Sequence, residues 1–133
     1  MTLPPVSRQE EPSFQLLDDG YYWFLHPLFK DLANETGQYI DLYGDASFSG
    51  SDLAGLEEML RLASKLIALQ PTTWNVIVGY ELVPYEKENH SRPHQKEKFA
   101  TVDRALFQFS VSEWERVVTR AKELNRPVVC FGD

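Results

Sequence analysis

The sequence predicts an α+β fold: a single domain in which a mixed β-sheet of about four strands packs with three helices, in the order α-β-α-β-β-α-β. Three observations lead to this prediction. Apolar residues recur at three- and four-residue steps in some segments and alternate with polar residues in others. Two predicted strand-helix-strand connections favour parallel neighbours, and one predicted hairpin gives an antiparallel pair. A length of 133 residues suits one domain.

The first 18 residues are predicted to be a flexible N-terminal tail, and residues 19–133 to be the single α+β domain. The tail contains several prolines among polar residues and too little apolar surface to order itself. Asp18 and Asp19 could cap a first turn, but the first full helix is expected to begin at Pro27. Gly37 is expected to end it.

A short strand is predicted next, from Tyr39 to Tyr43. Because side chains alternate across a strand, Ile40 and Leu42 would face the core. The opposite face would carry Tyr39, Asp41 and Tyr43, which makes this segment a place where polar chemistry can sit.

The second helix is predicted between the capping pattern Ser49-Gly50-Ser51-Asp52 and Pro71. A strand follows from Trp74 to Val83, and Gly79 within it is expected to mark a bulge. Residues 86–98 are rich in charge and poor in apolar residues, so they are predicted to be a solvent loop.

A return strand is expected at Phe99–Val102, whereas residues 103–109 fit either its continuation or the start of a helix. Ser110 and Glu113 form a capping box that predicts the start of the third helix. The run from Val128 to Phe131 predicts a buried closing strand. Cys130 lies in this run, so it is expected to be a buried apolar residue, and an unpaired cysteine suits a reducing compartment.

The formal net charge is −7, from 20 acidic and 13 basic residues. Such a charge repels phosphate backbones and anionic lipids, so nucleic acid and membrane are not expected as partners. A basic protein is favoured, although the same charge can simply keep a small domain soluble. No apolar run approaches the roughly 20 residues that span a bilayer, and no secretion signal is recognisable, so a cytoplasmic location is expected.

The candidate partner-binding residues are aromatic and acidic. Four consecutive aromatic residues, from Tyr21 to Phe24, cannot all face one core, so some of them should be exposed. Exposed tyrosines beside carboxylates are typical of binding hot spots. Packing of these aromatic residues beneath the N-terminal segment is the competing interpretation. The predicted partner-binding residues are Tyr21, Tyr22, Tyr39, Asp41, Tyr43 and Asp45.

A small enzyme is the alternative function, with Asp41 and Asp45 assisted by His26, by His90 and His94, or by a divalent metal ion. If extended, the four-residue step between the aspartates spans about 13 Å, so only a sharp turn at Gly44 could bring them together. The other interpretation leaves Asp41 in solvent and lets Asp45 shape the following loop.

The histidines provide equally little for an enzyme. His90 and His94 have the spacing of helical metal ligands, but Pro93 separates them in a charged segment. No glycine-rich phosphate loop or nucleophile elbow is present, so no cofactor, metal or catalytic residue is assigned. A third alternative is a structural protein that buries its aromatic patch against a second copy.

Three segments resemble small bacterial proteins, some of which are similar to immunity proteins of polymorphic toxin systems. They are Thr36-Gly37-x-x-Ile40-Asp41-x-Tyr43-x-Asp45, Gln70-Pro71-x-x-Trp74-x-Val76-x-Val78-Gly79 and Phe131-Gly132-Asp133. The resemblance covers residues 21–133 and rests on turn and core residues. It implies an inhibitor that binds a basic protein such as a toxin nuclease, and it carries over no catalytic residue.

Overall fold

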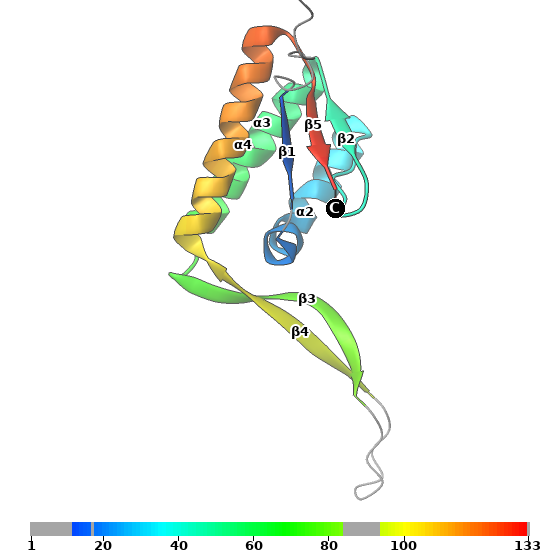
Figure 1. Ribbon diagram of the computed structural model, residues 1–133, viewed down its shortest axis with the longest axis vertical. Coiled ribbons are helices and arrows are strands. Elements are labelled where there is room, and N and C mark those ends of the chain that lie inside the picture. Colours follow the sequence, from blue (N-terminus) through cyan, green and yellow to red (C-terminus); the bar gives the residue numbers. More distant parts are fainter. Residues whose placement is uncertain (1–11, 17, 84–93, 133) are drawn as a thin grey trace, which may run out of the picture.

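The computed structural model describes residues 12–16, 18–83 and 94–132, and it confirms the predicted α+β class (Figure 1). Three helices and five strands are present in these residues. The prediction of one mixed sheet of about four strands is wrong: the strands form two separate sheets, and the additional strand, β1, precedes the first helix. The elements are β1 (Ser13–Gln15), α2 (Asp19–Thr36), β2 (Ala46–Phe48), α3 (Ser51–Ala68), β3 (Thr73–Val83), β4 (His94–Asp103), α4 (Arg104–Leu124) and β5 (Val128–Phe131).

The first sheet has the order β1-β5-β2, with β5 parallel to β1 and antiparallel to β2. Its strands lie over α3 and α4 (Figure 1). One face is apolar and buried, and it consists of Phe14, Ala46, Phe48, Val128 and Cys130. The sheet is therefore half-buried, as expected for short strands with alternating side chains.

Two predictions for this region are wrong. Residues 13–16 are not part of a flexible tail, because Ser13–Gln15 form β1 and because Phe14 and Leu16 are buried in the core. Residues 39–43 form no strand, although Ile40 and Leu42 are buried as predicted. The strand in this part of the chain lies a few residues later, at β2, where the backbone finds a partner in β5.

Helix α2 begins at Asp19 rather than at Pro27, because Asp18 caps it: its Oδ1 accepts the N–H of Tyr21 at 3.1 Å. Pro27 lies inside the helix. The apolar side of α2 is buried on both sides of the proline, and this packing offsets the hydrogen bond that proline cannot donate. Gly37 ends the helix with φ = 78°, as predicted.

The start of α4 also differs from the prediction. Asp103, not Ser110, is its N-cap, and its Oδ1 accepts the N–H of Leu106 at 3.0 Å. Residues 104–109, which the sequence left undecided, therefore belong to the helix. Because Phe107 is fully buried and stacks on Tyr21, tertiary packing extends the helix by six residues before the predicted capping box.

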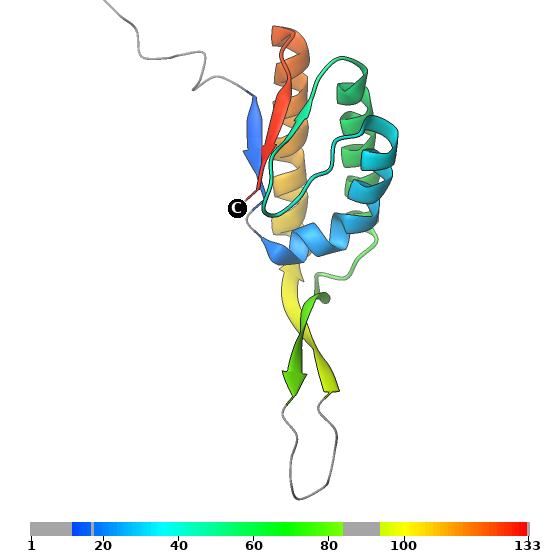
Figure 2. The same ribbon diagram turned by 90° about the vertical axis from the view of Figure 1, so that its right-hand side faces the viewer.

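Strands β3 and β4 form the second sheet, an antiparallel hairpin that projects from the rest of the molecule (Figures 1 and 2). The pairing register shifts between Ile77 and Gly79, which confirms the predicted bulge. The predicted solvent loop is wrong for residues 94–98, which belong to β4. Residues 84–93 lie outside the described residues.

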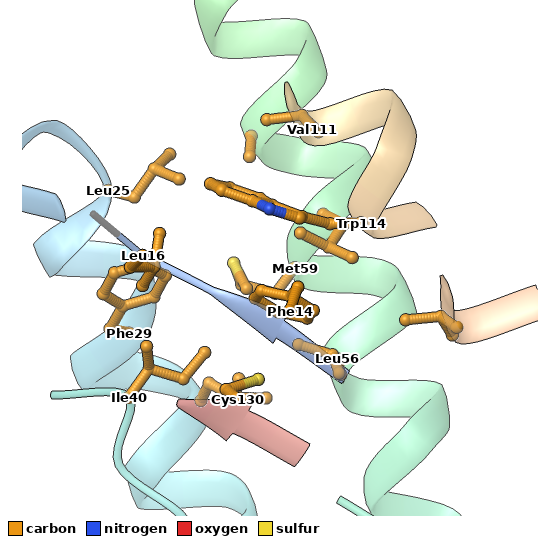
Figure 3. Close-up of a cluster of buried hydrophobic side chains, with 14 of the residues drawn as sticks. Phe14, Leu16, Leu25, Phe29, Ile40, Leu56, Met59, Val111, Trp114 and Cys130 are labelled. Atoms are coloured by element: carbon orange, nitrogen blue, oxygen red, sulfur yellow. The ribbon is translucent and has the colours of Figure 1, made fainter. Parts of the chain in front are cut away.

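The core is formed where the first sheet and the three helices meet, and Figure 3 shows side chains from β1, α2, α3, α4 and β5 packed together. Phe14 of β1 stacks on Trp114 of α4 with ring centroids 5.2 Å apart. Cys130 is buried as predicted, with 2% of its surface exposed. Burial raises the pKa of its thiol far above the ordinary value, so this cysteine is an apolar core residue.

Candidate functional site

The candidate site is built on residues 39–45, which we call the tyrosine loop and which connect α2 to β2. Two apolar residues anchor the loop: Ile40 and Leu42 are 1% and 6% exposed. The tyrosines between and beside them point outward, with Tyr39 40% and Tyr43 82% exposed. The alternation expected for a strand is therefore present without a strand, because the core holds every second side chain.

The two carboxylates of the tyrosine loop bind backbone groups. Asp41 Oδ1 accepts the N–H of Tyr43 at 3.1 Å, which forms a local turn. Asp45 Oδ1 accepts the N–H of Gly132 at 3.2 Å and so ties the loop to the residue after β5. Each carboxylate thus helps to hold the loop in shape while keeping its negative charge at the surface.

Two side chains of α2 form hydrogen bonds with Tyr39. Its hydroxyl lies 2.8 Å from the Tyr22 hydroxyl and 2.7 Å from His26 Nε2. Tyr22 is buried, with 3% of its surface exposed. Because Tyr39 has hydrogen-bond partners at its tip and Ile40 in the core behind it, its ring is fixed before any partner arrives.

The pKa of Tyr22 is raised far above its ordinary value of 10.0. Burial is the main cause, followed by the hydrogen bond to Tyr39 and by the negative charge of Asp41. Tyr22 therefore keeps its proton throughout the physiological range and remains able to hydrogen-bond with Tyr39.

Two predicted partner-binding residues lie elsewhere than expected. Tyr22 is in the core and acts as a support for Tyr39, so it offers no contact surface to a partner. Tyr21 is half-buried, and its ring stacks on Phe107 with centroids 4.0 Å apart and planes inclined by 3°. The competing interpretation, in which these aromatic residues pack inside the protein, is thus the better one for this pair.

Trp23 adds an aromatic side chain that the sequence reasoning did not include among the partner-binding residues. It is 39% exposed, and its ring lies 5.0 Å from that of His26. The signal was present, because Trp23 and His26 are three residues apart and so share a helix face. It was missed because the helix was expected to begin only at Pro27. We call Trp23, His26, Tyr39, Asp41, Tyr43 and Asp45 the acidic aromatic face.

In the described residues, no group of three or more His, Cys, Asp and Glu side chains is arranged to hold a metal ion. His26 is hydrogen-bonded to Tyr39. His90 lies outside the described residues, and the backbone of His94 is in β4. The geometry of the described residues therefore gives no support to a metal-assisted reaction at Asp41 and Asp45.

Comparison with known proteins identifies no relative: no protein-family model, no curated protein and no solved structure matches this chain. Within the part of the chain that the structure describes, no helix is both long and apolar enough to cross a membrane.

Proposed function

We propose that this protein is a protein-binding module that docks its acidic aromatic face on a basic partner protein, in the manner of an immunity-type inhibitor. The partner would present lysine and arginine side chains around a pocket that accepts an aromatic ring of this protein. Cytoplasm is the proposed location, since a single buried cysteine suits a reducing compartment.

The exposure of Tyr43 is the single observation that carries this proposal. Its side chain is 82% exposed, yet its backbone N–H is held by Asp41 and its neighbour Leu42 is buried. A large aromatic side chain on a fixed backbone loses little conformational entropy on binding, so it makes an effective anchor. The ring of Tyr39, which is held by its hydrogen bonds to Tyr22 and His26 and is 40% exposed, would add a second anchor.

Charge supplies the second argument. Asp41 and Asp45 flank Tyr43, and the whole chain has a net charge of −7. Opposite charge on a partner would accelerate encounter and orient the two proteins, and this contribution would weaken as salt screens it. Arginine and lysine on the partner could also stack on the exposed aromatic rings.

Parallel affinity capture tests the proposal. The tagged wild-type protein would be used as bait in a lysate of its own cells, at low and at high salt. The variants Tyr43→Ala and Asp41→Asn/Asp45→Asn would be used as baits in the same way. Asparagine retains an acceptor oxygen for the backbone N–H groups, so the double variant removes charge and keeps the turn. A matched control is Glu115→Gln, which removes one acidic charge from α4.

We expect a stoichiometric basic protein with the wild type and with Glu115→Gln. Tyr43→Ala should weaken its binding by at least about tenfold, since central aromatic anchors contribute more than about 1–2 kcal/mol. The Asp41→Asn/Asp45→Asn variant should bind more weakly and with a smaller dependence on salt. A partner that binds all four proteins equally would exclude the acidic aromatic face, and absence of any heterologous partner would overturn the proposal.

A further inference from the structure

The β3–β4 hairpin exposes a row of large apolar side chains that does not belong to the acidic aromatic face. Ile77, Tyr80, Leu82 and Phe99 are 38%, 57%, 68% and 53% exposed. They lie on the hairpin that projects from the body of the molecule in Figures 1 and 2. We call these four side chains the hairpin apolar face.

The base of the hairpin already has a packing partner. Trp74 pairs with Val102, and Val76 pairs with Ala100, so these residues share one face of the ribbon. Val102 is buried, and Trp74 and Val76 pack against the core. This first face therefore attaches the hairpin to α2 and α4, whereas the residues that alternate with it, Asn75, Ile77, Phe99 and Thr101, are exposed.

The bulge brings the four exposed residues onto that opposite face. Ile77 is paired with Phe99, Tyr80 with Glu97 and Leu82 with Gln95, and the β4 partners occupy alternate positions. Paired residues point to the same side of an antiparallel ribbon, so Ile77, Tyr80 and Leu82 lie on one face with Phe99.

Without the extra residue Val78, the pairing would place Tyr80 and Leu82 on the face opposite Ile77. Because of the bulge, Tyr80 and Leu82 continue the apolar row that Ile77 and Phe99 begin. A continuous row of exposed apolar side chains favours association with another apolar surface.

The charge of the outer hairpin favours a second copy of this chain over a basic partner. Residues 77–83 and 94–99 contain Glu81 and Glu97 against Lys96 and Lys98, so their formal charges cancel. The rest of the chain carries the whole net charge of −7. Two copies therefore repel each other least where their hairpins meet, and a basic protein would be drawn elsewhere.

The size of the face points to a dissociable contact. On β3 the face runs from Ile77 to Leu82, about 20 Å along the strand, and a two-stranded ribbon is about 10 Å wide. Two such strips buried against each other cover only several hundred Å² in total, well below the roughly 1,200 Å² at which stable specific interfaces begin, so the contact is weak and transient. Packing of a second copy would also support the outer half of the ribbon, since isolated two-stranded hairpins are only marginally stable.

We propose that the hairpin apolar face is a self-association surface, through which two copies of this chain pack face to face around a two-fold axis. The contact is self-complementary: the Ile77 and Phe99 end of one copy covers the Tyr80 and Leu82 end of the other. This proposal does not depend on the proposed function, because it uses different side chains and different chemistry. The two surfaces adjoin at Trp23, which lines one pocket with Ile77 and Tyr80.

Sedimentation velocity between about 5 and 500 μM tests it, since mass action moves a dissociable dimer across this range. The wild type should shift from monomer towards dimer as concentration rises. The variant Tyr80→Thr/Leu82→Thr should remain monomeric, and threonine preserves strand propensity so that the hairpin is retained. Leu124→Gln, at the opposite end of α4 from the hairpin, is the matched control and should dimerise like the wild type.

Salt distinguishes this contact from binding through the acidic aromatic face. Raising the salt concentration should leave the dimer unchanged or strengthen it, because apolar burial is not screened. A wild type that stays monomeric at the highest concentration overturns the proposal. So does a dimer that persists in Tyr80→Thr/Leu82→Thr, which would place the contact on another surface.

Discussion

The carboxylate of Asp45 accepts a hydrogen bond from the backbone N–H of Gly132, 3.2 Å away and 87 positions later in the chain. This bond closes the tyrosine loop against the end of β5. A glycine is needed at position 132 because the backbone of Leu42 and Gly44 passes directly over it. Loop and closing strand therefore form one unit.

Replacement of Gly132 by alanine should destabilise the protein strongly. A Cβ atom at this position would lie 2.5 Å from both N and O of Gly44 and 2.7 Å from O of Leu42. These are backbone atoms, so the loop or the strand must move. We expect Gly132→Ala to lower the free energy of unfolding by at least about 2 kcal/mol in urea titrations.

Gly79→Ala is the matched control for Gly132→Ala. A Cβ atom at Gly79 would meet nothing within 4 Å, and its φ is not in the left-handed region. Its free energy of unfolding should change by less than about 0.5 kcal/mol. Equal stability losses in the two variants would show that the close approach at Gly132 is not a constraint.

The pair Tyr22 and Tyr39 should show coupling in a double-mutant cycle. Tyr39→Phe leaves the buried hydroxyl of Tyr22 without its partner, which should cost about 1–3 kcal/mol of unfolding free energy. Tyr22→Phe should cost less, because Tyr39 keeps His26 and solvent as partners. The double variant should therefore lose less than the sum of the single losses. Strict additivity in urea unfolding would argue against the hydrogen bond.

Stability should fall at alkaline pH because of Tyr22. In the unfolded chain this phenol loses its proton near its ordinary pKa of 10.0, whereas burial raises its pKa in the folded protein. Below pH 10 both states hold the proton and the stability is fully present. Above it the unfolded state binds fewer protons, so the free energy of unfolding decreases as pH rises. Tyr22→Phe should flatten this decrease between about pH 10 and 12, and an unchanged slope would contradict it.

Phe14 should contribute to stability as a core residue does, although the sequence suggested a flexible tail. It is 9% exposed and stacks on Trp114. Phe14→Ala should lower the free energy of unfolding by about 3 kcal/mol, measured by urea titration. Its neighbour Gln15 is exposed on the same strand and serves as the control. If Phe14→Ala and Gln15→Ala were equally mild, β1 would not be part of the cooperative fold.

The longer elements of the fold could be predicted because each has a strong internal pattern. The stripe in α3, the alternation in β3 and the apolar run in β5 all occur where the sequence placed them. Strand β1 could not be predicted, because a strand of three residues with one buried side chain is too short to show a period.

Element starts were harder to predict, since competing signals were decided by packing. Both Asp18 and Pro27 can begin a helix, and both Asp103 and Ser110 can cap one. In each case the earlier signal is the one that the protein uses, because aromatic residues just after it are buried. Tyr22 follows Asp18, and Phe107 follows Asp103.

The candidate site was predictable in part for the same reason. Alternation in the tyrosine loop correctly separated Ile40 and Leu42 from Tyr39 and Tyr43. It could not show that Tyr22 and His26 support Tyr39, because this contact joins residues brought together only by the turn after α2.

The place of β5 in the first sheet has a consequence for synthesis on the ribosome. It is the middle strand, yet it follows every other described element along the chain. Until residue 131 has left the exit tunnel, β1 and β2 lack the strand with which both of them pair. The three helices can already pack on one another, but the side that the first sheet covers stays exposed. The first sheet can therefore form only as a late step in the folding of the nascent chain, after the residues of all three helices have been made.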